Sequence, residues 1–167
     1  MIKVGVLGSG SMGSGIAQVA ATAGHDVVLV DNNPDALNNA KSKLTKIMNR
    51  LVEKGRIDEQ TAADIQGRIS YETEMDAFAS CGLVIEAIIE DLGIKKTVFA
   101  KMEEAVPADC IIASNTSSLS ISAIGSALNN PERFVGIHFF NPAPLMKLVE
   151  IIPALQTTDA YLNTAKE

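Results

Sequence analysis

The chain has 167 residues, of which 47% are hydrophobic and 20% charged, as in one folded domain rather than a disordered segment. Its formal net charge of −6 disfavours a nucleic-acid partner. No apolar stretch approaches the roughly 20 residues needed to cross a bilayer, and the N-terminus lacks the pattern of a signal peptide. The two cysteines have no zinc-site spacing, so we expect a cytoplasmic chain with reduced thiols and neither a metal nor a membrane partner.

Short β-branched runs alternate with longer helical patterns, which predicts a doubly wound α/β fold, with a mostly parallel sheet and helices on both faces. The expected strands are 2–7, 26–30, 68–71, 83–87, 111–114, 134–139 and 146–152. The expected helices are 12–23, 34 to about 55 with Asn33 as its cap, 58–66 with Asp58 as its cap, 94–106, and one that begins near 120. On the second helix, a buried stripe is expected at Leu37, Ala40, Leu44, Ile47 and Leu51.

A GxGxxG motif follows the first expected strand and opens the first expected helix. Gly8 would allow the tight turn, Gly10 would let the backbone approach a pyrophosphate, and Gly13 would let the helix pack closely on the strand. The intervening Ser11 and Met12 lie at the helix N-terminus, where free N–H groups and the helix dipole attract an anion. This position predicts a Rossmann-type dinucleotide site over 8–13.

Asp31 ends the second expected strand, 18 residues after Gly13. A carboxylate there can accept hydrogen bonds from both hydroxyls of a ribose and repels a 2′-phosphate, so the sequence favours NAD over NADP. The alternative is a glycine-rich turn with an ordinary capping aspartate.

His138 and Glu150 are the leading candidates for acid–base chemistry. They are 12 residues apart on either side of an Asn-Pro-Ala-Pro turn, so neighbouring strands could bring them side by side. A carboxylate on one imidazole nitrogen orients the ring and leaves the other nitrogen to take a proton from an alcohol. From spacing alone, a core histidine bonded to a backbone carbonyl is an equal alternative, and we expect His25 to be structural.

Three segments carry a resemblance to a known family: Ser-Asn-Thr-Ser-Ser-Leu at 114–119, Gly-Ile-His-Phe-Phe-Asn-Pro at 136–142 and Met-Lys-Leu-Val-Glu at 146–150. Together they resemble the L-3-hydroxyacyl-CoA dehydrogenase family, above all its bacterial 3-hydroxybutyryl-CoA members, and the likeness extends over 2 to about 153. The resemblance implies an NAD-dependent oxidoreductase of fatty acid or butyrate metabolism that interconverts 3-hydroxyacyl-CoA and 3-oxoacyl-CoA.

The resemblance also implies roles for single residues. His138 would be the catalytic base, Glu150 its orienting partner, and Ser117 the group that hydrogen-bonds the substrate's 3-oxygen beside the cofactor. Asn141 would lie near the nicotinamide ribose and the substrate, and Glu90 and Lys95 match positions that contact the cofactor. Glu86 is the less certain of the two glutamates in that segment.

Each of these roles has a structural alternative. Ser117 could cap the helix that begins near residue 120, because serine favours caps. Glu90 and Lys95 could form an exposed surface pair of little energetic value. Cys81 and Cys110 are expected to pack in the core, since neither has a basic neighbour in the sequence.

Four basic residues at spacings of 3, 4 and 4 follow one face of the second helix: Lys43, Lys46, Arg50 and Lys54. This face could meet the phosphates of CoA, or it could be an ordinary solvated face. The resemblance matches Lys54 to a CoA-contacting lysine. It also finds Ile47 where some relatives use a serine, which leaves the contacts to the adenine end of CoA open.

The same resemblance implies a further helical domain that supplies dimer contacts, part of the acyl pocket and another catalytic Asn. We therefore expect residues 1–167 to form the NAD-binding domain alone, with that helical domain absent, full-length relatives to be homodimers, and this chain to turn over acyl-CoA weakly or not at all. Two other functions stay open: a dehydrogenase of a hydroxy acid without CoA, and an NAD(H)-binding module without catalysis.

Overall fold

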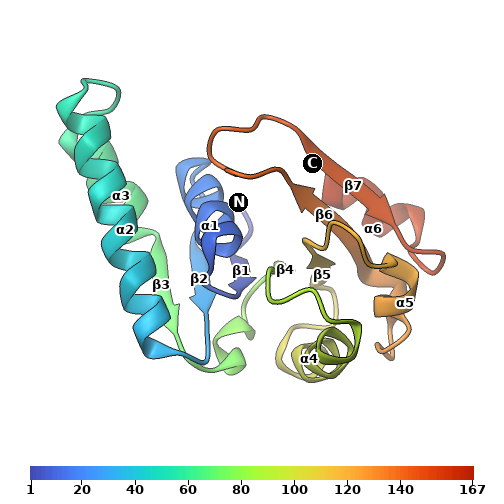
Figure 1. The fold of residues 1–167 in the computed structure, drawn as a ribbon. Helices are drawn as coiled ribbons and strands as arrows, with labels where there is room; N and C mark the ends of the chain where they lie inside the picture. Colours follow the sequence, from blue (N-terminus) through green and yellow to red (C-terminus); the bar gives the residue numbers. More distant parts are fainter.

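A single seven-stranded sheet organises the computed structural model, which describes residues 1–167 (Figure 1). Its strands follow the order β3-β2-β1-β4-β5-β6-β7, in which only β7 is antiparallel to its neighbour. This order is that of the doubly wound Rossmann fold, and it confirms the expected fold class. The strands are β1 Val4–Leu7, β2 Val27–Val30, β3 Ile69–Glu72, β4 Leu83–Glu86, β5 Ile111–Ser114, β6 Phe134–Phe139 and β7 Val149–Pro153.

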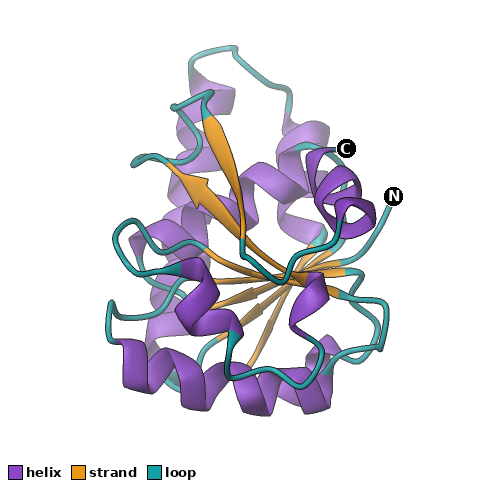
Figure 2. Ribbon diagram, turned by 90° about the vertical axis from the view of Figure 1, so that its right-hand side faces the viewer, coloured by secondary structure: helices purple, strands orange, loops and turns teal.

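Helices cover both faces of the sheet (Figure 2). They are α1 Ser11–Thr22, α2 Pro34–Glu53, α3 Glu59–Gly67, α4 Leu92–Ala105, α5 Ile121–Gly125 and α6 Asp159–Lys166, with 3-10 turns at Met75–Phe78 and Pro131–Arg133. One core cluster joins α1, α2, α3 and α6 to one face, and the other joins α4 and α5 to the opposite face. None of these helices combines the length and hydropathy that crossing a membrane requires.

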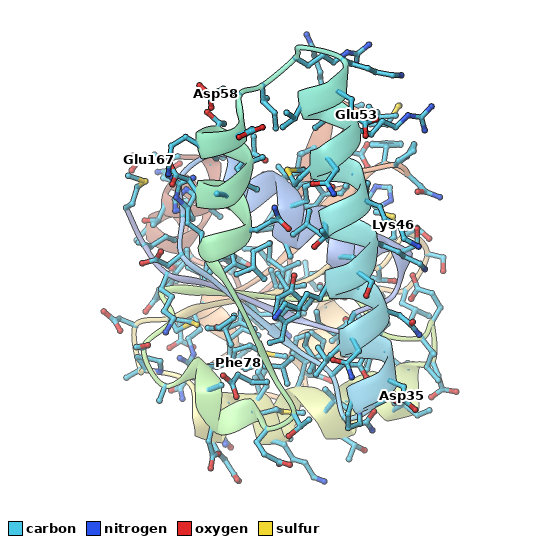
Figure 3. All side chains as sticks on the ribbon, turned by 90° about the vertical axis from the view of Figure 1, so that its left-hand side faces the viewer. Asp35, Lys46, Glu53, Asp58, Phe78 and Glu167 are labelled. Carbon is cyan, nitrogen blue, oxygen red and sulfur yellow. The ribbon has the colours of Figure 1, made fainter.

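The helix starts follow the capping residues that the sequence shows. The Asn33 side chain accepts from the N–H groups of Asp35 and Ala36, at 3.0 and 3.4 Å, and Pro34 occupies the first helical position of α2. Asp58 caps α3 by accepting from Thr61 N at 2.7 Å. Figure 3 shows α2 and α3 side by side on one flank of the molecule.

The buried stripe of α2 differs from the expected one at its C-terminal end. Leu37, Ala40 and Leu44 are buried as expected, but Met48 continues the stripe, whereas Ile47 is 42% exposed. At 3.6 residues per turn, position 48 lies four after 44 and returns to the core face, while position 47 lies at the edge of that face.

The C-terminal segment holds a helix that the sequence patterns did not lead us to expect. Residues after Pro153 read as polar, yet Asp159–Lys166 form α6, and Tyr161 and Ala165 pack on the first core cluster. The last strand also begins later than expected, at Val149, because 146–148 belong to the exposed connection that follows β6.

A buried ionic cluster anchors the C-terminal half of α4. Glu103 accepts hydrogen bonds from the backbone N–H groups of Asn129 and Asn130, at 2.7 and 2.9 Å, and lies 3.4 Å from the guanidinium of Arg133. Burial raises the pKa of Glu103, but these hydrogen bonds and the ion pair outweigh it, so its pKa lies below the ordinary value. The charged form therefore stabilises the fold above pH 4.5, and this contribution is lost as the pH falls through the folded-state pKa.

We expect Glu103→Gln to lower the free energy of unfolding at pH 7 by about 1–3 kcal/mol, because the buried donors lose a charged acceptor. The stability of the variant should also fall less between pH 7 and pH 3 than that of the wild type. Urea unfolding at several pH values measures both effects. Glu104→Gln, at the exposed neighbouring position, is the control and should change the stability by less than about 0.5 kcal/mol.

Candidate functional site

The turn between β1 and α1 brings backbone to backbone with no room for side chains at two of its glycines. Gly8 has φ +101°, and a Cβ there would lie 2.7 Å from the carbonyl oxygen of Ala87. A Cβ on Gly13 would overlap the carbonyl oxygen of Gly8. At Gly10, by contrast, a Cβ would meet nothing within 4 Å. Gly8 and Gly13 therefore shape the turn, and Gly10 keeps the space above the turn open.

The open space belongs to a cleft of about 1250 Å³ at the carboxyl edge of the sheet. Gly10, Ser11 and Met12 line its floor, where no side chain caps the first turn of α1 and no acidic residue stands in that turn. Free N–H groups there are positioned for an anion. Apolar groups from the segments around β4 and α4 form another wall: Met75, Ile88, Ile94, Val98 and Ala105.

Asp31 lies on the rim of this cleft just after β2, and Ser9 holds its carboxylate. Oδ2 accepts from both the backbone N–H and the hydroxyl of Ser9, at 2.8 and 2.7 Å, and Oδ1 accepts from Asn33 N at 3.0 Å. Burial raises the pKa of Asp31, but the bonds from Ser9 and Asn33 outweigh it and hold the pKa below its ordinary value. Asp31 is thus a fixed negative charge at the expected place, and its contact with Ser9 was not predicted.

A smaller cavity of about 320 Å³ continues from the cleft. The two share Met12, Ala87 and Ile88, so they adjoin across the N-terminus of α1 and the end of β4. Its other lining residues belong to α4, to β6 and to the segments that follow β4, β5 and β6: Glu90, Lys95, Asn115, Ser117, His138, Phe139, Phe140 and Asn141. Six predicted site residues therefore meet in one place, namely Met12, Glu90, Lys95, Ser117, His138 and Asn141.

His138 and Glu150 are directly opposite each other in the antiparallel β6–β7 pair, which confirms that the strands bring them together. His138 Nδ1 lies 2.8 Å from Glu150 Oε2, and Nε2 has no hydrogen bond to a protein atom. The imidazole also packs against the ring of Phe140 at 4.7 Å between centroids. The alternative of a core histidine bonded to a backbone carbonyl does not hold for His138. His25, which is only half-buried, is the histidine bonded to a backbone carbonyl, with Nδ1 2.9 Å from Ile2 O.

Ser117 lies in the loop that follows β5, exposed and next to the smaller cavity. The helix cap is Ser120, whose hydroxyl accepts from Ala123 N at 3.2 Å, so the alternative that Ser117 caps α5 is wrong. Glu90 holds this loop by accepting from Ser117 N at 2.9 Å and from the Thr116 hydroxyl at 2.8 Å. The Ser117 hydroxyl itself makes no hydrogen bond within the protein.

Lys95 is not the exposed partner of Glu90 that one alternative described. Its side chain is 1% exposed, and Nζ lies 2.6 Å from Glu86 Oε1 and 3.6 Å from Glu90 Oε2. Glu86, treated above as the less certain glutamate, is therefore the closer ion-pair partner. Lys95 lines the smaller cavity, and its Nζ lies between the carboxylates of Glu86 and Glu90.

Lys54 is not brought to either cavity. It is the exposed C-cap of α2 and continues the basic face of Lys43, Lys46 and Arg50, all of them exposed. Cys81 and Cys110 are buried as expected, and burial raises the pKa of their thiols to about 11 and about 12.

Sequence reasoning gave no role to Asn115, which nevertheless lines the smaller cavity. Its Oδ1 accepts from Phe139 N at 2.8 Å and so ties the end of β5 to the end of β6 beside His138. Its place directly after a strand, at the carboxyl edge of a parallel sheet, is a signal that could have found it.

These features fit a dinucleotide: an open position at Gly10, unpartnered helix N–H groups for a pyrophosphate, and a fixed carboxylate at Asp31 for a ribose. The sequence model of the protein family described as "3-hydroxyacyl-CoA dehydrogenase, NAD binding domain" matches residues 3–167. The chain belongs to this family. As an NAD-binding domain of that family, it takes NAD as its cofactor.

Relatives and solved structures agree with this assignment. The domain is 42% identical to the 3-hydroxybutyryl-CoA dehydrogenase of Clostridioides difficile over 99% of its own length and 59% of the relative. A crystal structure of 3-hydroxybutyryl-CoA dehydrogenase from Escherichia coli K12 superposes with a TM-score of 0.96 and 42% identity, over 98% of this chain and 35% of that one. The crystal structure of (S)-3-hydroxybutyryl-CoA dehydrogenase from Ralstonia eutropha superposes with a TM-score of 0.96 and 37% identity, over 99% of this chain and 59% of that one. This chain thus spans about three fifths of the length of typical relatives.

Substitutions at two glycines of the turn should affect cofactor binding and folding differently. Gly10→Ala is expected to fold with little loss of stability, since φ is −62° there, but to bind NADH about tenfold or more weakly, because the methyl group projects into the cleft. Gly13→Ala is expected to be destabilised by about 2 kcal/mol or more, since the turn must open. Thermal unfolding and NADH titration of both variants measure this contrast, which equal behaviour would contradict.

The Asp31 carboxylate should set the preference for NADH over NADPH. Asp31→Ser is expected to weaken NADH binding by about tenfold and to narrow the preference, because a ribose acceptor and the repulsion of a 2′-phosphate are both lost. Titrations with the two cofactors measure the ratio. Asp35→Ser, on the exposed first turn of α2, is the control, and a variant at Asp31 with the wild-type ratio would refute the assignment.

Proposed function

We propose that the chain is the cofactor-binding part of an NAD-dependent dehydrogenase that interconverts 3-hydroxyacyl-CoA and 3-oxoacyl-CoA, with 3-hydroxybutyryl-CoA as the substrate class. The names of its relatives support the CoA thioester over a hydroxy acid without CoA. The observation that carries a catalytic role is the state of His138. Its Nδ1 is held by Glu150, and its Nε2 has no hydrogen bond within the protein. His138 lines the smaller cavity beside the cofactor cleft.

In this proposal the protein handles the proton. With Nδ1–H donated to Glu150, Nε2 of His138 carries the lone pair and takes the proton of the substrate's 3-hydroxyl. Glu150 keeps the ring oriented and stabilises the positive charge that the ring then carries. NAD⁺, when bound, supplies the acceptor for the hydride that leaves the carbon bearing this hydroxyl.

The Ser117 hydroxyl is the second group on the substrate's 3-oxygen. It is free to donate because its loop is fixed through the backbone, by the bond from Ser117 N to Glu90. In the direction of ketone reduction, Ser117 and the protonated His138 stabilise the charge that grows on the oxygen. Asn141 follows β6 beside His138 and is assigned to the cofactor ribose and the substrate, with Glu90 and Lys95 at the cofactor.

The CoA end of the substrate is assigned to the exposed basic face of α2, with Lys54 as its main contact. Lysines there can attract phosphates although the chain as a whole is acidic. Acyl-chain selection, dimerisation and full turnover are assigned to a helical domain, so residues 1–167 alone should reduce acetoacetyl-CoA slowly.

His138→Gln is expected to lower the rate of acetoacetyl-CoA reduction by NADH by roughly 10²–10⁴-fold, because the proton donor is lost. Glu150→Gln should lower it less, because the ring loses its orienting charge but keeps Nε2. Where turnover by residues 1–167 is too slow, the chain is fused to the remaining C-terminal part of the C. difficile relative and assayed in that form.

His25→Gln is the matched control, since it changes the other histidine, which bonds to a backbone carbonyl away from both cavities. NADH affinity should stay within about twofold in all three variants. Undiminished reduction by His138→Gln would refute the catalytic role of His138. No reduction by the wild-type protein, alone or in the fused form, would leave a cofactor-binding module without catalysis.

A further inference from the structure

Glu86 is a carboxylate that the proposed chemistry does not use. It is the last residue of β4, in register with Leu7 of β1 and Ser114 of β5, and it is 0% exposed. It lines neither cavity, so a bound cofactor or substrate does not touch it. A buried charge of this kind is costly to desolvate, and an apolar pair of the same size would stabilise the fold as well or better. Its presence directly beneath the site therefore calls for another explanation.

The hydrogen bonds of Glu86 reach three separate segments. Oε1 accepts from Lys95 Nζ and from Ile88 N, both at 2.6 Å, and Oε2 accepts from the Ser114 hydroxyl at 2.7 Å. The backbone oxygen of Glu86 also accepts from Asn115 N at 2.8 Å. One residue thus holds the segment after β4, the first half of α4 and the end of β5.

Each of these segments supplies a wall of the smaller cavity. Ile88 and Lys95 line it directly. The Ser114 hydroxyl accepts from Thr116 N at 3.2 Å, which fixes the loop that carries Ser117. Glu90, which lies 3.6 Å from the same lysine, also holds that loop, at Thr116 and Ser117. Lys95 is therefore shared between a buried carboxylate that aims it and an exposed one that holds the loop.

We propose that Glu86 is a positioning residue for the nicotinamide end of the cofactor. Its carboxylate fixes the Lys95 ammonium and, through Ser114, the loop of Ser117 in the arrangement that this end requires. The inference rests on the proposed function, which puts the nicotinamide in the smaller cavity. The pyrophosphate and adenosine bind along the larger cleft, and Glu86 does not hold the residues there other than Ile88.

ADP-ribose tests this division, since it has both phosphates and both riboses of NADH but lacks the nicotinamide. Glu86→Gln keeps the size of the side chain and removes its charge. We expect the variant to bind NADH about tenfold more weakly than the wild type and ADP-ribose within twofold of it, because charged hydrogen bonds hold only the nicotinamide side. Isothermal titration with the two ligands measures both constants.

Glu103→Gln is the matched control: a carboxylate on α4 that is likewise buried and paired, with Arg133, and that lines neither cavity. It should lose stability and keep both affinities. Ser114→Ala is the second variant and covers the case in which Glu86→Gln does not fold. It leaves all charges in place and cuts the link from Glu86 to the loop, so NADH binding should weaken at least threefold with ADP-ribose unchanged.

The outcomes separate the inference from the function on which it rests. If wild-type protein binds NADH no more tightly than ADP-ribose, the nicotinamide makes no favourable contact, and both the proposed placement and the inference fail. If the wild type prefers NADH and the folded variants keep that preference, Glu86 has no positioning role and the inference alone is overturned. An equal loss of affinity for both ligands would show that Glu86 has a structural role only, and would also overturn the inference.

Discussion

Among the glycines, the least room for a side chain is at Gly13 in the first turn of α1, where a methyl group would overlap the carbonyl oxygen of Gly8 just after β1. This contact brings the helix N-terminus up to the sheet edge and leaves Gly10 facing open space. The cleft, its continuation into the smaller cavity and the place of Asp31 all depend on it, because each is built on the edge that this turn shapes.

Charge in the site follows from the same arrangement. The chain carries a formal −6, and no side chain caps α1, so an anionic cofactor meets backbone N–H groups rather than a cluster of cations. The cation closest to the proposed chemistry is Lys95, which is set between Glu86 and Glu90. An acidic protein can thus bind a dinucleotide, since the dipole of one helix acts at short range where the net charge acts weakly.

Much of this could be predicted from the sequence where the signal is local. The caps at Asn33 and Asp58 and the glycine turn follow from residue type and spacing, and the structure agrees. Spacing alone left the pairing of His138 with Glu150 open, and the register of β6 and β7 decides for it. Contacts between distant segments left no such signal. The burial of Lys95 and its pairing with Glu86 depend on how α4 crosses β4, and the bond from Ser9 to Asp31 joins residues 22 apart. The helix α6 escaped notice because its few apolar residues meet the core only through the tertiary fold.

The antiparallel edge strand β7 has a consequence for which changes of length the chain can accept. Side chains alternate between the two faces of a strand, so a deletion of one residue inside Val149–Pro153 would turn either Glu150 or the residues packed beneath it to the wrong side. The connection between β6 and β7 is not a strand, and most of it is exposed, so it has no such alternation to preserve. Homologous chains should therefore vary in length before this strand and not within it.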